Sequence, residues 1–437
     1  MYKHYLKQWW TLIKQNRFYT TVYITGTTLA ITMTMVMAIV YHIRTANIAP
    51  ESNRDRMLIV AGACAENKVG GGQHNWSLSY QTLKECYYTL QKPKFVAAGV
   101  NTNSLSNNVG DFYTSVPGSN NVFNSFIYYT DAAFFKVFDF TFISGKPYSE
   151  EEFQSGMHCA ILSKTLAYKL FETDNALNNT ILINDVEFTV TGVVNDVSPV
   201  LNKAYAELWV PYSSNPAVID INGGGGIVGS FSAFILADKK EDFPLIREDI
   251  EQSKKKYNTS IAEWEYIIKD DAIMSAIQSE IRKLDRNAKF RDIIFRYGII
   301  AFIFLLVPAV NLSGITSSHV QERIDEFGIR KVFGATRNAL INQILTENFL
   351  LTLLGGLTGL IISGIIVYYM RELLLGEGIS MMSGTEINIS FSMLYNFWIF
   401  GFTFIICLIL NVFSAIIPVW NVTRRPIIQS INNNNNF

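Results

Sequence analysis

Four stretches of the chain carry no charged side chain and are long enough to cross a bilayer, which takes about 20 apolar residues. They cover residues 18–41, 297–318, 348–370 and roughly 395–419. A buried helix of a soluble protein rarely reaches such a length without a charge. The pattern therefore predicts an α-helical membrane protein with four transmembrane helices.

Between the first two stretches, residues 45–292 show the mixed pattern of a large extracytoplasmic α+β domain in two lobes. Two β-rich runs surround Asn184 and Asp185, which is typical of a β-hairpin. Ahead of them, Ser163 is placed to cap a helix. Further expected elements are a helix at 84–90 and a strand at 95–100.

Two more helices are predicted at the borders of this domain. Residues 2–17 combine tryptophans and lysines in a pattern typical of a helix lying on the inner membrane surface, with a simple extension of the first span as the alternative. From Ile277 a heptad-like seam predicts a stalk, although an amphipathic helix packed on the domain fits equally well. The predicted domains are 1–44, 45–292 and 293–437.

The composition agrees with a membrane protein. The chain is 49% hydrophobic and 17% charged, and its mean hydropathy is +0.18. Its net charge of −1 and the lack of a basic stripe give no sign of a nucleic-acid partner. Four cysteines are too few for a disulfide framework; Cys64 and Cys86 could pair, but free buried thiols fit at least as well.

The lysines and arginines predict the orientation. They gather at the N-terminus, in the loop 319–348 and after the last apolar stretch, whereas the loop 371–394 has only Arg371. We therefore expect both termini and the loop 319–348 in the cytoplasm. A basic cluster at 282–296 conflicts with this, but long domains are translocated largely regardless of charge.

No motif supports catalysis by this chain. It has no GxxxxGK[ST], HExxH, GxSxG or CxxC pattern, and its five histidines are scattered. We expect no catalytic, metal or cofactor site in this chain; if ATP and Mg²⁺ are involved, a partner chain would bind them. The lack of charged residues within the spans also argues against an ion-coupled transporter.

Small residues recur every four positions in the first and third apolar stretches. Such spacing lets membrane helices approach closely, although glycine and alanine are common in membrane helices anyway. The stripe residues are Gly26, Ala30, Thr34 and Ala38 in the first stretch and Gly355, Gly359 and Ser363 in the third.

The most specific stretch is the loop 319–348. Glu326 and Arg330 have the favourable i, i+4 spacing of an ion pair, Gly334 interrupts the helix, and Thr336 is placed to cap the next one. A compact connector of mixed charge between two spans can transmit force to a docked partner. A solvated connector is the alternative interpretation.

The pattern ER-x-x-E-x-GIRK-x-x-GAT in this loop resembles the signature of the FtsX-like permease family. The end of the chain is similar to the closing P-x-W/R…P pattern of that family. Residues 130–149 and 160–197 resemble a MacB-type periplasmic domain, and residues 6–31 are similar to the family's first span. The resemblance covers nearly the whole chain.

The resemblance implies a type VII ABC system in the bacterial cytoplasmic membrane. In that family two permease subunits pair, as homo- or heterodimer, and ABC ATPase subunits dock on the loop between spans two and three. Motion then passes to the periplasmic domain without substrate crossing a membrane channel. A periplasmic adaptor and an outer-membrane channel are possible further partners. The resemblance assigns coupling to Glu322, Arg323, Glu326, Gly328, Arg330, Lys331, Gly334 and Ala335.

Two functions stay open on the sequence. The first is export of periplasmic cargo such as peptides or drugs. The second is a signalling or regulatory complex that controls a periplasmic partner such as a cell-wall hydrolase, or lipoprotein release. MacB-type proteins carry their ATPase domain on the same chain, which this sequence does not, so a narrow assignment to macrolide or toxin efflux is not implied.

Overall fold

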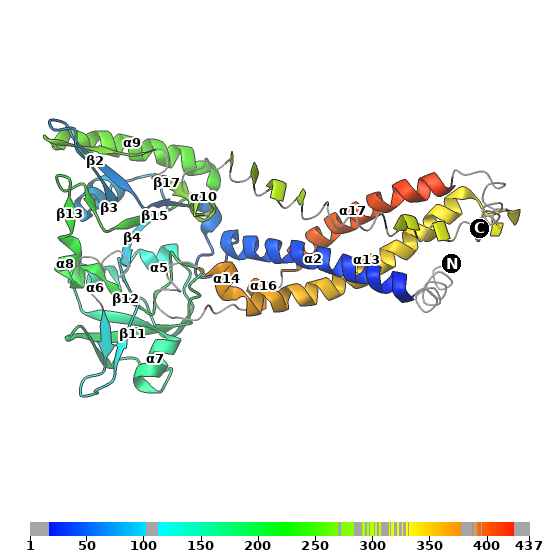
Figure 1. The fold of residues 1–437 in the computed structure, drawn as a ribbon. Coiled ribbons are helices and arrows are strands. Elements are labelled where there is room, and N and C mark those ends of the chain that lie inside the picture. The colour runs from blue at the N-terminus through cyan, green and yellow to red at the C-terminus, as the bar shows by residue number, and fades with distance from the viewer. Residues whose placement is uncertain are drawn as a thin grey trace. The chain divides into compact units, whose positions relative to one another are not determined.

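The computed structural model describes residues 17–101, 112–269 and 272–283, scattered residues between 291 and 331, then 332–376, 387, 391–394 and 396–423 (Figure 1). The chain divides into two compact units. The sheet unit comprises Ile43–Phe290 and Leu375–Asn388. The helical unit comprises Met1–His42, Arg291–Leu374 and Ile389–Phe437.

The sheet unit contains a mixed 12-stranded sheet and an antiparallel 5-stranded sheet. The strands of the large sheet are β1 (Met57–Val60), β4 (Phe95–Asn101), β5 (Tyr113–Ser115), β6 (Val122–Asn124), β7 (Ile127–Thr130), β8 (Phe142–Gly145), β9 (Cys159–Ser163), β10 (Thr180–Ile183), β11 (Val186–Val194), β12 (Leu208–Pro211), β15 (Ser232–Leu236) and β17 (Ile273–Ser275). Their order is β17-β1-β15-β4-β7-β12-β9-β11-β10-β5-β6, and β8 pairs with β11.

The small sheet has the order β13-β14-β3-β2-β16. Its strands are β2 (Ala63–Asn67), β3 (Gln73–Leu78), β13 (Asn222–Gly223), β14 (Val228–Gly229) and β16 (Trp264–Ile267). Short helices connect the strands (Figure 1). The longer α9 packs on β16. The α-helices are α3 (Tyr80–Thr82), α5 (Phe134–Val137), α6 (Glu150–Gln154), α7 (Lys164–Phe171), α8 (Pro216–Ile219), α9 (Phe243–Ser260) and α10 (Ala276–Arg282). The other short helices are η1 (Arg54–Arg56), η2 (Leu83–Tyr87), η3 (Tyr212–Ser214) and η4 (Lys240–Asp242).

Three strands in the core of the sheet unit are buried along their whole length. Every residue of β1, β9 and β12 is buried, because both faces of these strands are covered. In the sequence, such strands appear as nearly continuous apolar runs rather than as alternating apolar and polar residues. The large indole of Trp209 is fully buried, and its Nε1 donates to the carbonyl of Ala204 at 3.1 Å, so its polar atom is satisfied.

Several local predictions are confirmed. Asn184 and Asp185, with φ of 47° and 67°, form the two-residue turn between β10 and β11, as expected for the left-handed backbone of a tight hairpin. Ser163 caps α7 by accepting a hydrogen bond from the N–H of Leu166. The strand expected at 95–100 is β4. The helix expected at 84–90 is shorter, a single wide turn at η2.

All four cysteines are free and buried. The bridge between Cys64 and Cys86 that the sequence left open is therefore not formed. Both thiols instead contribute to the apolar core, in which both are at most 2% exposed.

The helical unit contains α2 (Arg17–Thr45, which extends three residues into the sheet unit), α13 (Arg337–Tyr369), α14 (Arg371–Leu375), α16 (Phe391–Leu394) and α17 (Phe397–Thr423). Among the described residues, two helices are long and apolar enough to cross a membrane, Arg17–Thr45 and Asn338–Tyr369. They coincide with the first and third predicted spans, and the fourth falls on α17. The second predicted span, the surface helix at 2–16 and the seam beyond Lys283 lie largely or wholly outside the described residues.

Candidate functional site

The loop 319–348 turns sharply at Gly334. This residue has a φ of +89°, which L side chains rarely adopt. The N–H of Ala335 donates to the carbonyl of Arg330 at 3.0 Å, the bond of a Schellman cap at a helix C-terminus. Thr336 then accepts a hydrogen bond from the N–H of Ala339 at 3.3 Å and caps α13, as predicted. The letters GAT therefore end one helix and begin the next.

Polar side chains fasten this turn to α13. The expected ion pair is present, with 2.6 Å between Arg330 Nη2 and Glu326 Oε1. Arg330 Nη1 also donates to Gln343 Oε1 at 2.6 Å, and Gln343 Nε2 donates to Glu347 Oε1 at 3.0 Å. Because the ion pair is partly exposed, it should contribute only about 0.2–0.5 kcal/mol. Its main effect is to fix the direction of the segment before the turn.

Among the residues of the loop that the structure describes, three large apolar side chains are exposed: Ile329, Val332 and Phe333, which we call the connector patch. Their i, i+3, i+4 spacing places them on one helix face. Phe333 is 86% exposed. A group of exposed large apolar side chains is typical of a surface that another protein covers.

The structure describes five of the eight predicted coupling residues: Glu322, Glu326, Arg330, Gly334 and Ala335. Arg323, Gly328 and Lys331 lie outside the described residues. Glu322 is exposed. The connector patch was not predicted from the sequence, although the spacing of its apolar residues within a charged loop could have indicated it.

Hydrogen bonds between side chains join α2 to α13, which run alongside each other (Figure 1). Lipid offers no partner to a hydroxyl group, so polar side chains in membrane helices bond across helix interfaces. From one end of the interface to the other, the contacts are Tyr19 Oη to Asn348 Oδ1 at 3.5 Å, Tyr23 Oη to Thr352 Oγ1 at 3.4 Å, Thr28 Oγ1 to Thr358 Oγ1 at 2.8 Å, and Thr32 Oγ1 to the Gly359 carbonyl at 3.3 Å.

The small-residue stripe of α13 lies in this interface. A Cβ atom on Gly355 would come 2.9 Å from Thr27 Cβ, and one on Gly359 would come 3.1 Å from Ile31 Cγ2. A side chain on Gly355 would force α2 to shift, and one on Gly359 would require Ile31 to give way by a few tenths of an ångström. The third stripe residue, Ser363, is fully buried.

α17 approaches α13 from another side. A Cβ atom on Gly356, next to the stripe, would lie 2.4 Å from Phe404 Cε2 of α17. Glycines therefore let α13 pack closely against two helices.

The small-residue stripe predicted on α2 does not form the contact with α13. Gly26, Ala30, Thr34 and Ala38 are half-buried, whereas the residues of α2 that approach α13 are Tyr23, Thr27, Thr28, Ile31 and Thr32. The association of a second subunit with that stripe stays a prediction.

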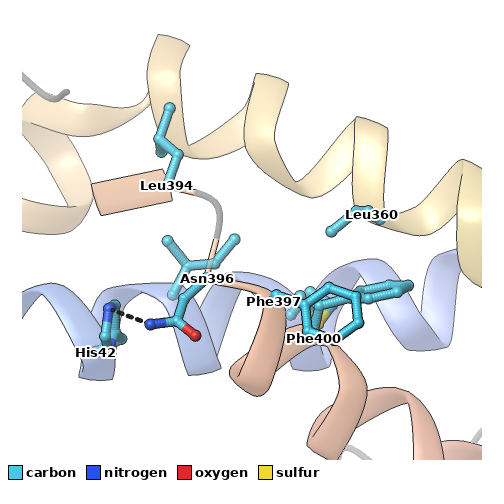
Figure 2. A pocket seen from close by; sticks show the side chains of 8 residues that line it. His42, Leu360, Leu394, Asn396, Phe397 and Phe400 are labelled. Atoms are coloured by element: carbon cyan, nitrogen blue, oxygen red, sulfur yellow. Dashed lines mark hydrogen bonds between the residues drawn. The ribbon is translucent and has the colours of Figure 1, made fainter. Parts of the chain in front are cut away.

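A cavity of about 190 Å³ lies among α2, α13, α16 and α17 (Figure 2). Among the described residues, the polar ones that line it are His42 and Asn396, whose side chains point toward each other with 3.4 Å between Nε2 and Nδ2. The apolar lining residues are Met35, Ile39, Leu360, Leu394, Phe397 and Phe400.

Among the described carboxyl groups of the sheet unit, Asp131, at the start of α5, has a strongly raised pKa. Its Oδ1 accepts from the N–H of Phe134 at 2.9 Å, and its Oδ2 accepts from Tyr88 Oη at 2.6 Å and from the N–H of Ala98 at 2.8 Å. Burial raises the pKa of Asp131 to about 7, against the opposing effect of these hydrogen bonds. The group is sealed inside the domain, where it positions α5 and β4. Among the residues described, no cluster of three or more potential ligands could hold a metal ion.

Two family descriptions match the chain. "MacB-like periplasmic core domain" matches residues 20–253, and "FtsX-like permease C-terminal" matches residues 298–427.

Curated relatives agree with these matches. The chain is 28% identical over 217 residues to the uncharacterized ABC transporter permease YknZ of Bacillus subtilis, covering 50% of this chain and 51% of that protein. It is 26% identical over 247 residues to the pyoverdine export ATP-binding/permease protein PvdT of Pseudomonas syringae, and the match covers 55% of this chain and 35% of that protein. It is 24% identical over 245 residues to the macrolide export ATP-binding/permease protein MacB of Pasteurella multocida, and the match covers 56% of this chain and 35% of that protein. The chain thus spans between a third and a half of these relatives' lengths.

Solved structures give weak similarities of shape. The periplasmic region of MacB from Actinobacillus actinomycetemcomitans aligns at a TM-score of 0.36 and 17% identity, covering 53% of this chain and 93% of that one. The extracellular domain of YknZ aligns at a TM-score of 0.31 and 12% identity, covering 47% and 100%.

Proposed function

The chain belongs to the FtsX-like ABC transporter permeases with a MacB-like periplasmic core domain, and on this premise we propose that it couples ATP hydrolysis by a separate ATPase to movement of its sheet unit. Permeases of this family are membrane components of ABC transporters. In the proposal the sheet unit lies in the periplasm, both termini and the loop 319–348 lie in the cytoplasm, and two permease subunits pair.

The observation that carries the proposal is the connector patch on a rigid turn. A docked ATPase needs an exposed surface, and large apolar side chains such as Phe333 are the usual anchors of a protein interface. The Schellman cap at Gly334 and the bonds of Arg330 to Glu326 and Gln343 hold the patch in a fixed direction. A push on the patch would therefore move the start of α13 instead of bending the loop.

From α13 the movement has a route into the rest of the helical unit. The hydrogen bonds between α2 and α13, together with the tight contacts of Gly355 and Gly359, oppose sliding of one helix along the other. α2 leads directly into the first strands of the sheet unit. This arrangement supports transmission of motion through helices without a channel for the cargo.

For the cargo we propose a small periplasmic molecule such as a peptide or a drug. Two relatives are named for export, of pyoverdine and of macrolides. We expect that cargo added to the periplasmic side of proteoliposomes raises the ATPase rate. Unchanged rates with a macrolide and with a siderophore peptide would argue against this class of cargo.

The coupling proposal is tested with Phe333→Ala and Glu326→Lys in the full chain. Both side chains are exposed or partly exposed, so both variants should express and insert normally. Removing the aromatic anchor, or reversing a charge against a partner surface, can cost several kcal/mol at an interface. We expect loss of ATPase co-purification from detergent and loss of function.

Tyr168→Ala is the matched control, because Tyr168 is a large side chain of α7, 60% exposed, in the sheet unit. It should co-purify with the ATPase as the wild-type chain does. Full ATPase binding and activity in both loop variants would refute the coupling role and leave the loop as a connector.

A further inference from the structure

A buried arginine follows the first predicted span. Arg54 is only 1% exposed although it lies in a charge-rich stretch. Its Nη1 donates to the carbonyls of Ile43 at 3.0 Å and Ala46 at 3.1 Å, and its Nε donates to Glu51 Oε2 at 2.7 Å. The carbonyls at the end of a helix lack partners within the helix, so Arg54 caps the last turn of α2 with a positive charge.

Glu51 extends this contact to a distant loop. Its second oxygen, Oε1, accepts hydrogen bonds from the N–H of Lys203 at 2.9 Å and of Ala204 at 3.3 Å. Glu51 is buried as well, at 2% exposed. The end of α2 is thereby fixed, through two buried charges, to the loop between β11 and β12.

The same loop reaches α10. The Nζ of Lys203 lies 3.9 Å from Glu280 Oε1, and Asn202 Nδ2 lies 3.5 Å from the same oxygen. Lys283 Nζ contacts both oxygens of Glu280, at 2.8 and 2.9 Å. Burial raises the pKa of Glu280, but the attraction of Lys203 and Lys283 outweighs it and lowers the pKa below its ordinary value, so this carboxylate is charged at neutral pH.

The segment around Arg54 is also bound to the large sheet. Asn53 Nδ2 donates to the carbonyl of Val137 in α5 at 3.0 Å. The N–H of Ala237, directly after β15, donates to the carbonyl of Arg56 at 3.0 Å. A displacement of this segment therefore acts on the sheet itself.

We propose that residues 202–204 form a joint that makes the end of α2 and α10 move together. On one side Glu51, which Arg54 holds in place, binds the joint, and on the other side Glu280 does. This inference rests on the proposed function, since α10 is the last helix described before the second predicted span. Asn202 and Lys203 are positioning residues for the coupling.

Because the joint is largely buried, its charged contacts are costly to break. Exposed ion pairs are weak and easily exchanged, whereas breaking a buried pair leaves a charge without compensation. Lys203 binds Glu51 through its backbone and Glu280 through its side chain. The side-chain link can therefore be cut by mutation while the backbone link stays.

The test uses the double variant Asn202→Ala/Lys203→Met in the full chain, co-purified with its ABC ATPase. Hydrogen exchange of residues 198–204 and 276–282 is measured without nucleotide and with a non-hydrolysable ATP analogue. In the wild type we expect the nucleotide to change exchange in both segments, by about tenfold. In the double variant the change should persist in 198–204, which stays bound to Glu51 at the end of α2, and disappear in 276–282.

The control is Lys94→Met, which removes a 3.7 Å ion pair with Asp238 that is largely exposed on the same unit. It should behave as the wild type does. A nucleotide response in 276–282 that survives the double variant, or that is absent from the wild type, would overturn the joint while leaving the proposed function intact. Loss of the ATPase from the wild-type preparation would instead count against the proposed function, and the joint would fall with it.

Discussion

The hydroxyl groups of Thr28 on α2 and Thr358 on α13 lie 2.8 Å apart, although 330 positions separate them in the chain. Each hydroxyl is small enough for the two helices to approach closely. The neighbouring glycines of α13 make that approach possible. The contact between the two helices thus depends on side-chain size as much as on hydrogen bonding.

Gly355→Val and Gly359→Val should destabilise the helix pair. The added atoms would overlap Thr27 and Ile31, and overpacking of this kind typically costs about 1–3 kcal/mol. Thermal unfolding in detergent should show a lower Tm for both variants. Gly401→Val on α17 is the control, because a Cβ atom there meets nothing within 4 Å. Equal Tm values for all three variants would refute the close contact.

The turn at Gly334 should tolerate asparagine better than valine. Asparagine adopts positive φ at modest cost, whereas a β-branched residue does so only with strain. We expect Gly334→Asn to keep most ATPase stimulation and Gly334→Val to lose most of it, with normal membrane insertion in both. If Gly334→Val stimulates the ATPase fully, ATPase coupling does not depend on the direction of the connector patch.

The stripe on α2 predicts contact with a second subunit. Ala30→Leu adds bulk to the half-buried stripe and should reduce cross-linking between subunits. Met33→Leu, at a neighbouring exposed position, conserves volume and should have no effect. Unchanged cross-linking in Ala30→Leu would mean that the stripe faces lipid.

The predicted topology is tested by labelling with a membrane-impermeant maleimide. Val69→Cys lies in a turn of the sheet unit, where Val69 is 90% exposed, and Asn338→Cys lies at the exposed start of α13. In whole cells with a permeabilised outer membrane, only the first should react. The opposite pattern would reverse the assigned orientation.

Asp131 predicts a specific pH dependence of stability. Its folded pKa, about 7, is above the ordinary value of 3.8, so the folded chain holds a proton that the unfolded chain releases between these values. The stabilisation is complete below pH 3.8 and is lost as the pH rises through about 7. At about 1.4 kcal/mol per unit, the effect amounts to several kcal/mol. The Tm difference between the wild type and Asp131→Asn should therefore fall from pH 4 to pH 8, and a constant difference would contradict the prediction.

Local elements were predictable because their causes are local. The turn at Asn184 and Asp185, the caps at Ser163 and Thr336, and the ion pair of Glu326 with Arg330 each depend on residues a few positions apart. Turn chemistry and capping act over such distances.

Contacts between distant segments were not predictable in the same way. The small residues of α13 predicted that another helix packs closely against it. They could not predict which helix, because any helix with small side chains can pack in this way. Arg54 sits in a stretch rich in charge, which reads as a solvated loop. Its burial depends on Glu51 and on the end of α2, and only the folded chain brings these groups together.

The burial of the native thiols has a practical consequence for the chain. Burial raises the pKa of Cys86 and of Cys159 to about 12, so at pH 7.5 only on the order of 10⁻⁴ to 10⁻⁵ of each is the reactive thiolate. An exposed thiol under the same conditions is about a tenth ionised. Alkylating reagents should therefore distinguish an introduced surface cysteine from Cys86 and Cys159 by several orders of magnitude in rate, and probes can be attached without first replacing these two residues.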